Sequence, residues 1–563
     1  MRVSSLALLV ALALPAVAPA QTSAARTAGT VRKHIVYFRD KTGTPFSVSQ
    51  PQAFLSARAI QRRTRQNIAV TARDLPVNPA YVTQVKAVPG AAVWYTSRWF
   101  NAAVVNCDSA TLAAVRALPF VRSATTLNRP GAGTGRPDRA QPTAAPDQSR
   151  AAAHPFYGRA YEQARMIGAV SMHNAGFRGE GVQIAVFDEG FPGVDQASQF
   201  ASMRTENRLL DTYNFVERTS NVFRRGGHGT NCLSTMAGNQ EGVYVGTAPK
   251  ASYRLYITED GSSENPIEEA NWLLAAERAD SAGVDVISSS LGYYDFDTAY
   301  GNYTYADMNG RTTLVSRAAT VAARVGIVVV NSAGNEGNNA WRYIIAPADA
   351  DSVLAVGAVD SMRVRAGFSS VGPSSDGRIK PNLAAQGRAT AIVSTNGQVV
   401  RSNGTSFSCP VLAGMAAGFI QANPRLSAQQ VIGFLQRSGS QYTNPDNLLG
   451  YGIPNFVTAY NLANPGNPLA AAAPGRAAEL LAVYPNPAAG NELFVQLPAA
   501  LRGAGVLRVR FYDLRGAVVA EQQLPASAAA EVRLRPGGLA QGVYTCEVQA
   551  GNGARRSAPF VKL

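Results

Sequence analysis

Cysteines, histidines and long apolar runs are all scarce in this chain of 563 residues. Four cysteines are too few for a dense disulfide framework, so the fold must rest on packed cores. After residue 20, no segment has the roughly 18 uninterrupted apolar residues that a membrane-spanning helix needs. We therefore expect no transmembrane segment. The chain is also too long for one ordinary domain, so we expect several.

The charge of the chain is unevenly distributed. The formal net charge is +15, yet residues 21–150 hold 18 Lys and Arg against 5 Asp and Glu, whereas residues 151–462 hold 23 against 26. A nucleic-acid-binding protein concentrates basic residues on its binding domain. Because the basic charge lies near the N-terminus and the large central part is near neutral, we expect no nucleic-acid partner.

The first 20 residues have the three parts of a secretory signal peptide. Arg2 gives the positive start, residues 6–14 form a short apolar run, and A-P-A at 18–20 is a cleavage site before Gln21. The apolar run is too short to span a bilayer. We expect residues 1–20 to be removed on export, leaving a mature protein that is soluble or attached to a surface.

Composition divides the rest of the chain into three expected domains joined by two linkers. The linkers, 128–154 and 463–478, are rich in Pro, Gly and Ala and lack apolar periodicity. Residues 21–127 indicate a small α+β domain, residues 155–462 an α/β domain, and residues 479–563 a small β-sandwich. The first linker should be exposed and accessible to proteases.

Apolar periodicity predicts the elements of each domain. The first domain has predicted strands at 34–39, 99–106 and 121–126 and helices at 53–65, 79–87 and 109–118. The second has strands at 182–187, 252–257, 284–288, 326–331 and 352–359, and helices at 265–282, 314–324, 408–421 and 427–437. The third has strands at 492–496, 506–513, 518–523, 532–534 and 542–550. Continuous β-branched runs separated by helices predict a parallel sheet with helices on both faces in the second domain.

Three short stretches supply a carboxylate, an imidazole and a hydroxyl. Asp188 closes a predicted strand, where functional groups gather in open α/β sheets; alone, it is better explained as a strand-ending acid that caps a turn. His228, in R-R-G-G-H-G-T, begins a helix predicted to run to residue 237; alone, it is equally explained as an exposed loop histidine. Ser406, in N-G-T-S-F-S-C-P, precedes an apolar helix; alone, it would be an N-cap serine.

A fourth stretch, N-S-A-G-N-E-G, contains Asn335, which is either a turn asparagine or a donor to an oxyanion. A serine hydroxyl is a weak nucleophile that needs a base within hydrogen-bond reach, and the base needs an orienting carboxylate. The order Asp, His, Asn, Ser around one parallel sheet favours a catalytic set with nucleophile, base, orienting carboxylate and oxyanion donor over four unrelated residues. The string G-T-S-F-S lacks the G-x-S-x-G pattern of α/β-hydrolases.

The strings F-D-E-G, H-G-T, S-S-L-G, A-G-N-E-G and G-T-S-F-S-C-P resemble the signature segments of the subtilisin-like serine peptidases (subtilases), over about residues 157–462. The resemblance implies a subtilisin-like α/β fold and a secreted serine endopeptidase that is made as an inactive precursor. It implies that Asp188 orients His228, that His228 is the general base and then the acid, and that Ser406 attacks the peptide carbonyl. Asn335 and the Ser406 amide would hold the oxyanion. An extended polypeptide substrate would bind along Ser290, Leu291, Gly292, Ala333 and Gly334.

The resemblance implies no cofactor for the chemistry. Calcium is common in the family, and two acidic clusters occur, but neither has EF-hand-like spacing and neither is assigned as a ligand set. The clusters are Glu259, Asp260 and Glu264, and Asp295 with Asp297. Glu189 stands where relatives commonly have a small residue.

The sequence leaves open whether Cys232 and Cys409 form a disulfide. Cys232 and Cys409 lie on the predicted helices that present His228 and Ser406, and some relatives have a free cysteine at the position of Cys232. We favour two small buried residues over a disulfide. Cys107 and Cys546 fall in different domains and are expected to be unpaired.

The flanking domains resemble known parts of secreted subtilases. Residues 21–127 resemble a propeptide, which implies a removable intramolecular inhibitor and a maturation site in 128–154. Residues 479–563 contain V-Y-P-N-P, F-Y-D-L-R-G and L-A-Q-G-V-Y, which resemble the C-terminal sorting domain of the type IX secretion system. This implies the type IX machinery as a partner and an extracellular or cell-surface location. The alternative is an accessory sandwich that binds substrate or polysaccharide.

Two other functions remain open at this stage. One is a catalytically silent binding protein on the same scaffold, which the complete set of four residues disfavours. The other is a different acyl-transfer enzyme, such as an esterase or a peptide ligase. The sequence assigns neither the preferred substrate residue nor the physiological substrate.

Overall fold

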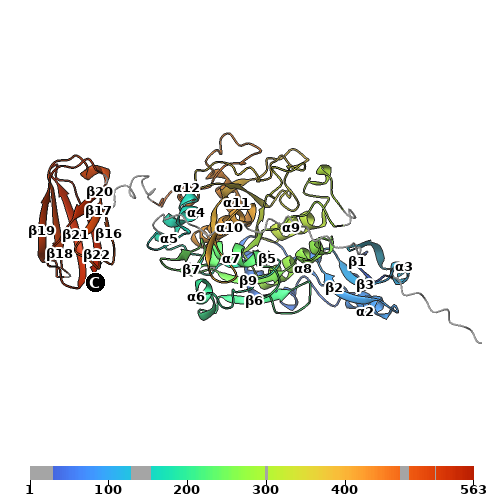
Figure 1. The fold of residues 1–563 in the computed structure, drawn as a ribbon. Coiled ribbons are helices and arrows are strands. Elements are labelled where there is room, and N and C mark those ends of the chain that lie inside the picture. Colours follow the sequence, from blue (N-terminus) through green and yellow to red (C-terminus); the bar gives the residue numbers. More distant parts are fainter. Residues whose placement is uncertain (1–29, 129–153, 298–301, 470–480, 514, 530) are drawn as a thin grey trace, which may run out of the picture. The chain divides into compact units, whose positions relative to one another are not determined.

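A computed structural model describes residues 30–128, 154–297, 302–469, 481–513, 515–529 and 531–563. The predicted signal peptide, most of the first linker and residues 470–478 of the second lie outside these ranges. The chain forms one compact unit through Gly466 and a second from Asn467 onward (Figure 1). In the described part of the chain, no helix combines the length and apolarity needed to cross a membrane.

The N-terminal domain is an antiparallel sheet of four strands in the order β2-β3-β1-β4. Its strands are β1 (Arg32–Phe38), β2 (Ala92–Ser97), β3 (Ala102–Cys107) and β4 (Val121–Thr126), and its α-helices are α1 (Ala57–Arg65), α2 (Pro79–Ala87) and α3 (Ser109–Arg116). Side chains such as Val36, Val105 and Leu112 form its core. The predicted α+β class is confirmed, but the sequence did not reveal β2.

The central domain is built on seven parallel strands in the order β13-β12-β11-β10-β5-β9-β6. They are β5 (Gln183–Asp188), β6 (Leu209–Asn214), β9 (Ser252–Ile257), β10 (Val286–Ser289), β11 (Val328–Ser332), β12 (Leu354–Val359) and β13 (Leu383–Gln386). Every residue of β10, β11, β12 and β13 is buried, as expected for strands covered on both faces.

Two pairs of long helices cover the two faces of this sheet (Figure 1). One pair is α8 (Ile267–Ala282) and α9 (Leu314–Arg324), and the other is α7 (His228–Ala237) and α10 (Thr405–Ala422). The remaining elements are α4 (Tyr161–Met166), α5 (Ala169–Asn174), α6 (Ala201–Thr205), α11 (Ala428–Arg437), α12 (Phe456–Ala463), and the hairpins β7–β8 (Asn239–Gln240, Tyr244–Val245) and β14–β15 (Thr390–Val393, Val399–Ser402).

The order of the strands creates a crevice at one edge of the sheet. The chain enters at β5, adds β6 and β9 on one side, and then adds β10, β11, β12 and β13 on the other. The direction of winding therefore reverses between β5 and β10. In open α/β sheets, ligands bind at the carboxyl ends of the strands beside such a reversal.

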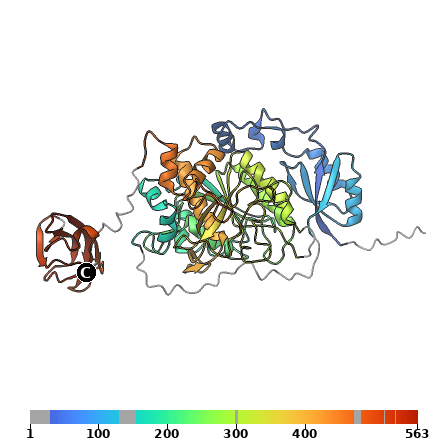
Figure 2. The same ribbon diagram turned by 90° about the horizontal axis from the view of Figure 1, so that it is seen from above.

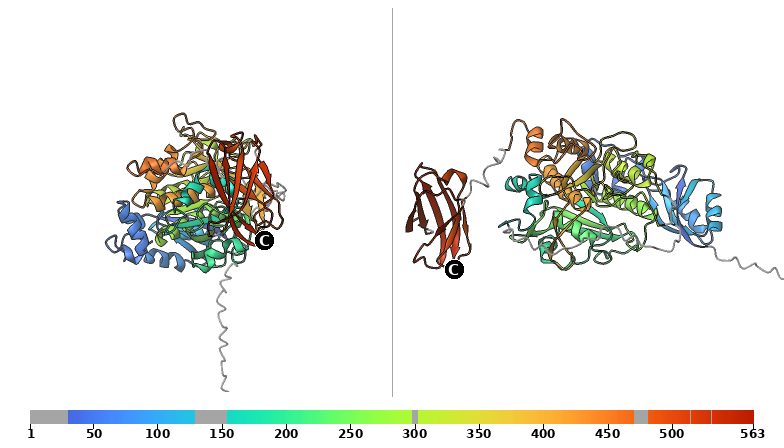
Figure 3. Two further views of the ribbon diagram at one scale, coloured as in Figure 1. Left: turned by 90° about the vertical axis from the view of Figure 1, so that its left-hand side faces the viewer. Right: turned by 45° about the horizontal axis from the view of Figure 1, so that its top comes forward.

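The C-terminal domain consists of two antiparallel sheets, β16-β17-β20 and β19-β18-β21-β22 (Figure 3). The strands are β16 (Ala482–Tyr484), β17 (Leu493–Gln496), β18 (Leu507–Tyr512), β19 (Val518–Leu524), β20 (Glu531–Leu534), β21 (Gly542–Ala550) and β22 (Arg555–Lys562). Buried side chains such as Val495, Phe511 and Val548 form one core. This agrees with the predicted β-sandwich, with β16 and β22 in addition.

Candidate active site

A carboxylate and an imidazole meet at the carboxyl end of β5. Asp188 is the last residue of this strand and is fully buried, and His228 is the first residue of α7. Asp188 Oδ1 lies 2.9 Å from His228 Nδ1 and also accepts the Glu189 amide at 2.9 Å. A carboxylate at this ring nitrogen favours a proton on Nδ1 and leaves Nε2 as the basic atom.

Glycine permits the close approach of α7 to β5. A Cβ on Gly229 would lie 2.8 Å from Asp188 Cβ and 2.4 Å from the carbonyl oxygen of Gly190, which no side chain tolerates. Glu189 also has a local role, because its carboxylate accepts the His228 amide at 3.2 Å. An acid at this place partners an otherwise unpaired first-turn amide and lies at the positive end of the helix dipole.

Ser406 is the second residue of α10, and this helix begins three residues earlier than predicted. The prediction placed Pro410 in the first turn, but Pro410 lies inside the helix. Proline lacks an N–H, so the carbonyl of Ser406 loses its usual helical donor. Ser290 Oγ at 2.8 Å and Cys232 Sγ at 3.3 Å donate to this carbonyl instead, which allows the helix to extend through Pro410.

Asn335 is held with its amide nitrogen available to the cleft. Its Oδ1 accepts the Thr405 amide at 2.9 Å and the Thr405 hydroxyl at 3.0 Å. The Thr405 N–H can only donate, so the oxygen of the side-chain amide must face Thr405. The Asn335 NH₂ group is then free to donate to another acceptor.

One cleft brings together the predicted site residues. His228, Asn335 and Ser406 line it, and so do Ser290, Leu291, Gly292 and Gly334. The predicted substrate-binding residue Ala333 is placed differently. It is fully buried in a small apolar cluster with Ile344, Ala348 and Ala355.

The cleft also has lining residues that sequence reasoning missed, among them Glu336, Tyr294, Glu264 and Ile345. The Ile345 side chain occupies the space between two glycine segments. A Cβ on Gly292 would lie 2.3 Å from Ile345 Cδ1, and a Cβ on Gly334 would lie 3.0 Å from Ile345 Cγ1. Ile345 therefore fills the base of the space between residues 290–292 and 333–335.

The charge of Asp188 tunes the imidazole. Burial has the largest single effect and acts to lower the pKa of His228, but Asp188 and Cys232 together raise this pKa well above the ordinary 6.5. Cys232 Sγ lies 3.7 Å from His228 Nδ1, and burial raises the pKa of this thiol. Cys232 therefore stays a neutral thiol beside the histidine. All four cysteines are free and buried, which confirms the preference against a Cys232–Cys409 disulfide.

Three acidic residues near the cleft lie close enough together to be considered as a calcium site. Carboxylate oxygens of Glu259, Glu264 and Glu268 lie within 4.8 Å of one another. Glu259 already accepts the Tyr293 hydroxyl at 2.6 Å, and Glu268 accepts the Asp260 amide at 2.7 Å. Calcium needs six to eight oxygen ligands, and protein donors already use Glu259 Oε1 and both oxygens of Glu268, so we assign no calcium ligand here.

Three family profiles match the chain in succession. They are "Peptidase S8 propeptide domain, Bacteroidota" over residues 33–141, "Subtilase family" over residues 179–452 and "Secretion system C-terminal sorting domain" over residues 482–561. These matches show a secreted subtilisin-like serine protease that is made as a precursor. The sorting domain indicates export to the extracellular space or the cell surface.

Individual relatives match the central domain. Subtilisin DY of Bacillus licheniformis is 32% identical over 290 residues, which are 51% of this chain and 93% of that protein. Serine protease AprX of Bacillus subtilis (strain 168) is 29% identical over 308 residues, covering 49% of this chain and 65% of that protein. Subtilisin NAT of Bacillus subtilis subsp. natto is 31% identical over 297 residues, covering 52% and 69%.

Among solved structures, MycP1 with its N-terminal propeptide removed aligns with a TM-score of 0.43 at 21% identity, covering 53% of this chain and 96% of that chain. The family assignment rests on the sequence matches. By its central domain, this chain belongs to the subtilase family and is a serine-type endopeptidase.

Proposed function

We propose that Ser406, His228 and Asp188 are the catalytic triad of this endopeptidase, with Asn335 and the Ser406 amide as the oxyanion hole. The observation that carries the proposal is the 2.9 Å contact between Asp188 Oδ1 and His228 Nδ1 in a cleft that His228, Asn335 and Ser406 line together. The four residues come from four separate segments of the chain, which makes their convergence hard to explain by packing alone.

The chemistry follows from these positions. His228 Nε2 takes the proton of the Ser406 hydroxyl as Oγ attacks the peptide carbonyl, and the carbonyl oxygen becomes an oxyanion. The Asn335 NH₂ group and the Ser406 N–H, a first-turn amide of α10, donate to that oxyanion. The C–N bond breaks, and His228 gives its proton to the leaving amine. Water then hydrolyses the acyl-enzyme by the same steps in reverse.

An extended polypeptide is the substrate that this cleft suits. Residues 290–292 follow β10 and line the cleft, so a substrate strand can pair with them by main-chain hydrogen bonds. Such binding is largely independent of side chains, and selectivity then depends on the pocket that Ile345 closes. Peptide hydrolysis by this mechanism needs no cofactor, and we assign no calcium ligand.

The remaining domains have proposed roles in synthesis and export. Residues 21–127 act as an intramolecular inhibitor, and the maturation cut falls within 128–154. Residues 155–462 form the catalytic domain, and residues 479–563, beyond the 463–478 linker, engage the type IX secretion machinery. The order of the three profile matches supports this division.

Active-site labelling tests the catalytic assignment. A fluorophosphonate should modify the mature enzyme, and peptide mapping should place the label on Ser406. Ser406→Ala should abolish casein hydrolysis and self-maturation, whereas Ser408→Ala, on the same helix, should still mature. Casein hydrolysis by Ser406→Ala within tenfold of wild type would refute the assignment. Ester hydrolysis without casein hydrolysis would favour a different acyl-transfer enzyme.

A further inference from the structure

The propeptide holds the catalytic domain in two separate places. Its sheet packs on α8 near the β2–β3 turn, where Glu277 accepts the Arg98 amide at 2.9 Å and the Trp99 amide at 3.2 Å. The second place is formed by the segment between β1 and β2 that contains α1. Seen from above, this segment leaves the propeptide sheet and runs along the catalytic domain (dark blue in Figure 2).

Helix α1 lies at the edge of the parallel sheet opposite to the cleft. Arg58 donates to the carbonyl of Gly181 at 2.8 Å, just before β5, and pairs with Asp285, just before β10. Gln66 donates to the carbonyl of Gly326 at 2.8 Å, just before β11. These are the amino ends of three neighbouring strands, whereas the site residues lie at the carboxyl ends. Contacts at α1 therefore do not occlude the cleft.

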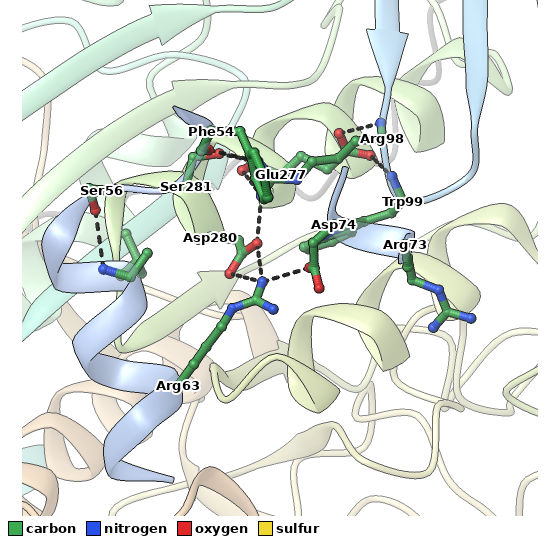
Figure 4. Close-up of polar contacts among 12 residues, drawn as sticks. Phe54, Ser56, Arg63, Arg73, Asp74, Arg98, Trp99, Glu277, Asp280 and Ser281 are labelled. Carbon is green, nitrogen blue, oxygen red and sulfur yellow. Dashed lines mark hydrogen bonds and ion pairs between the residues drawn. The ribbon is translucent and has the colours of Figure 1, made fainter. Parts of the chain in front are cut away.

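A buried carboxylate of the catalytic domain is the centre of this contact. Asp280 has no exposed surface and pairs with Arg62, Arg63 and Arg98, all from the propeptide. Figure 4 shows the contacts with Arg63 and Arg98. The side chains of Arg62 and Arg63 are 1% and 2% exposed. Arg63 also pairs with Asp74 of the propeptide at 2.8 Å. The propeptide thus supplies cations to an acid of the catalytic domain that is buried when the propeptide is docked.

Three arginines of the propeptide also donate to carbonyls around the C-terminal end of α8. This helix has no basic residue in its last turn, and it ends at Ala282 with Gly283 as its C-cap. Arg98 donates to the carbonyl of Glu277 at 3.1 Å, Arg58 to that of Gly283 at 3.0 Å, and Arg62 to that of Val284 at 2.6 Å. Cations at a helix C-terminus interact favourably with the helix dipole. The C-cap of α8 is Gly283, whose N–H donates to the carbonyls of Ala279 and Asp280, and the propeptide adds positive charge and donors around it.

We propose that α1 is a docking arm that holds the propeptide on the catalytic domain independently of the cleft, through Arg62 and Arg63 on Asp280. Removing one partner of a buried ion pair is strongly destabilising because the other charge remains buried and uncompensated. The arm therefore keeps the propeptide bound after the linker is cut, and it stabilises the last turn of α8. The proposal rests on the propeptide assignment and not on the catalytic roles.

The test measures release of the propeptide after the linker is cut. A full-length Ser406→Ala chain, which cannot process itself, receives a site for an added protease within 129–153. After cutting, the dissociation of the propeptide is followed by size-exclusion chromatography at nanomolar concentration. Arg62→Gln with Arg63→Gln should release it about 100-fold faster, whereas Arg73→Gln should not change the rate more than twofold. Arg73 is exposed in the same domain and is the matched control.

A second double variant keeps the proposal testable if Arg62→Gln with Arg63→Gln does not fold. The Arg58 and Arg65 side chains are 34% and 33% exposed and both pair with Asp285, so their loss should be tolerated. Arg58→Gln with Arg65→Gln should release the propeptide about tenfold faster, and amide exchange should rise in the last turn of α8 but not in α9. If both double variants released the propeptide at the same rate as Arg73→Gln, the proposal would be overturned.

Discussion

Asn335 and Thr405 are joined by two hydrogen bonds, from the Thr405 amide at 2.9 Å and from its hydroxyl at 3.0 Å, both to Asn335 Oδ1. Thr405 is the residue before Ser406 at the start of α10. The proposed oxyanion donor is therefore fixed to the same turn that presents the nucleophile. A donor that is fixed before the reaction needs no reorganisation when charge develops on the substrate.

The first prediction concerns this donor. Asn335→Ala should lower kcat by about 10²–10³ with little change in KM, because a bond formed mainly in the transition state is lost. Thr405→Val removes one of the two bonds that orient Asn335 and should lower kcat by a smaller factor. Steady-state kinetics on a peptide substrate distinguish the effects. A change confined to KM would make Asn335 a ground-state binding residue.

A second prediction concerns pH. His228 must be neutral to accept the serine proton, so activity should fall as the pH decreases through its pKa. Burial acts most strongly and lowers that pKa, whereas Asp188 and Cys232 together raise it, with the net result well above 6.5. The acid limb of the kcat/KM profile should therefore have its midpoint above pH 6.5. In Asp188→Asn the residual activity should show a lower midpoint, and an unchanged midpoint would contradict the role given to Asp188.

A third prediction concerns the residue on the acyl side of the scissile bond. Because Ile345 fills the space between Gly292 and Gly334, peptides with alanine there should be preferred over peptides with phenylalanine. Ile345→Ala should raise kcat/KM for phenylalanine relative to alanine by about tenfold or more, since each methylene in such a pocket changes discrimination by about 1–3 kcal/mol. Ile344→Val, in the core beside the cleft, is the control. Equal selectivity in both variants would show that Ile345 does not set it.

Local signals were sufficient to predict many of the elements. Helix α9 was predicted with the bounds that it has, and Thr313 caps its first turn through the Ser316 amide. The start of α7 at His228 and the strand β9 also agree with the prediction. In each case the periodicity of the buried face and the residues at the ends point to the same structure. The candidate site was likewise predicted from local sequence, by the order of Asp188, His228, Asn335 and Ser406 along the chain.

Contacts between distant segments could not be predicted. Arg62 and Asp280 are 218 residues apart, and the basic pattern of α1 gives no sign that two of its arginines are buried. Ile345 lies in an irregular segment, so its approach to Gly292 has no local signal. The start of α10 was misplaced because the donors that replace the missing N–H of Pro410 come from Ser290 and Cys232.

The last prediction concerns export. The described residues that line the cleft all belong to the first unit, and the C-terminal unit, Asn467–Leu563, matches a sorting domain. Folding of the catalytic domain should therefore not need it, whereas crossing an outer membrane should. A chain truncated after Leu462 should be an active enzyme that is retained in the periplasm of a host with the type IX system. Replacing the 463–478 linker by a Gly/Ser segment of equal length is the control and should preserve export.

The gain-of-function counterpart separates sorting from a general effect of truncation. Residues 463–563, placed after a passive reporter that follows a signal peptide, should carry that reporter out of the same host. The physical reason is that the sandwich has its own core, formed by side chains such as Leu493, Phe511 and Val548, and can be recognised without the protease. Fractionation of cells and medium gives the readout. Equal release of the truncated and full-length enzymes would show that this domain is an accessory module and not a sorting signal.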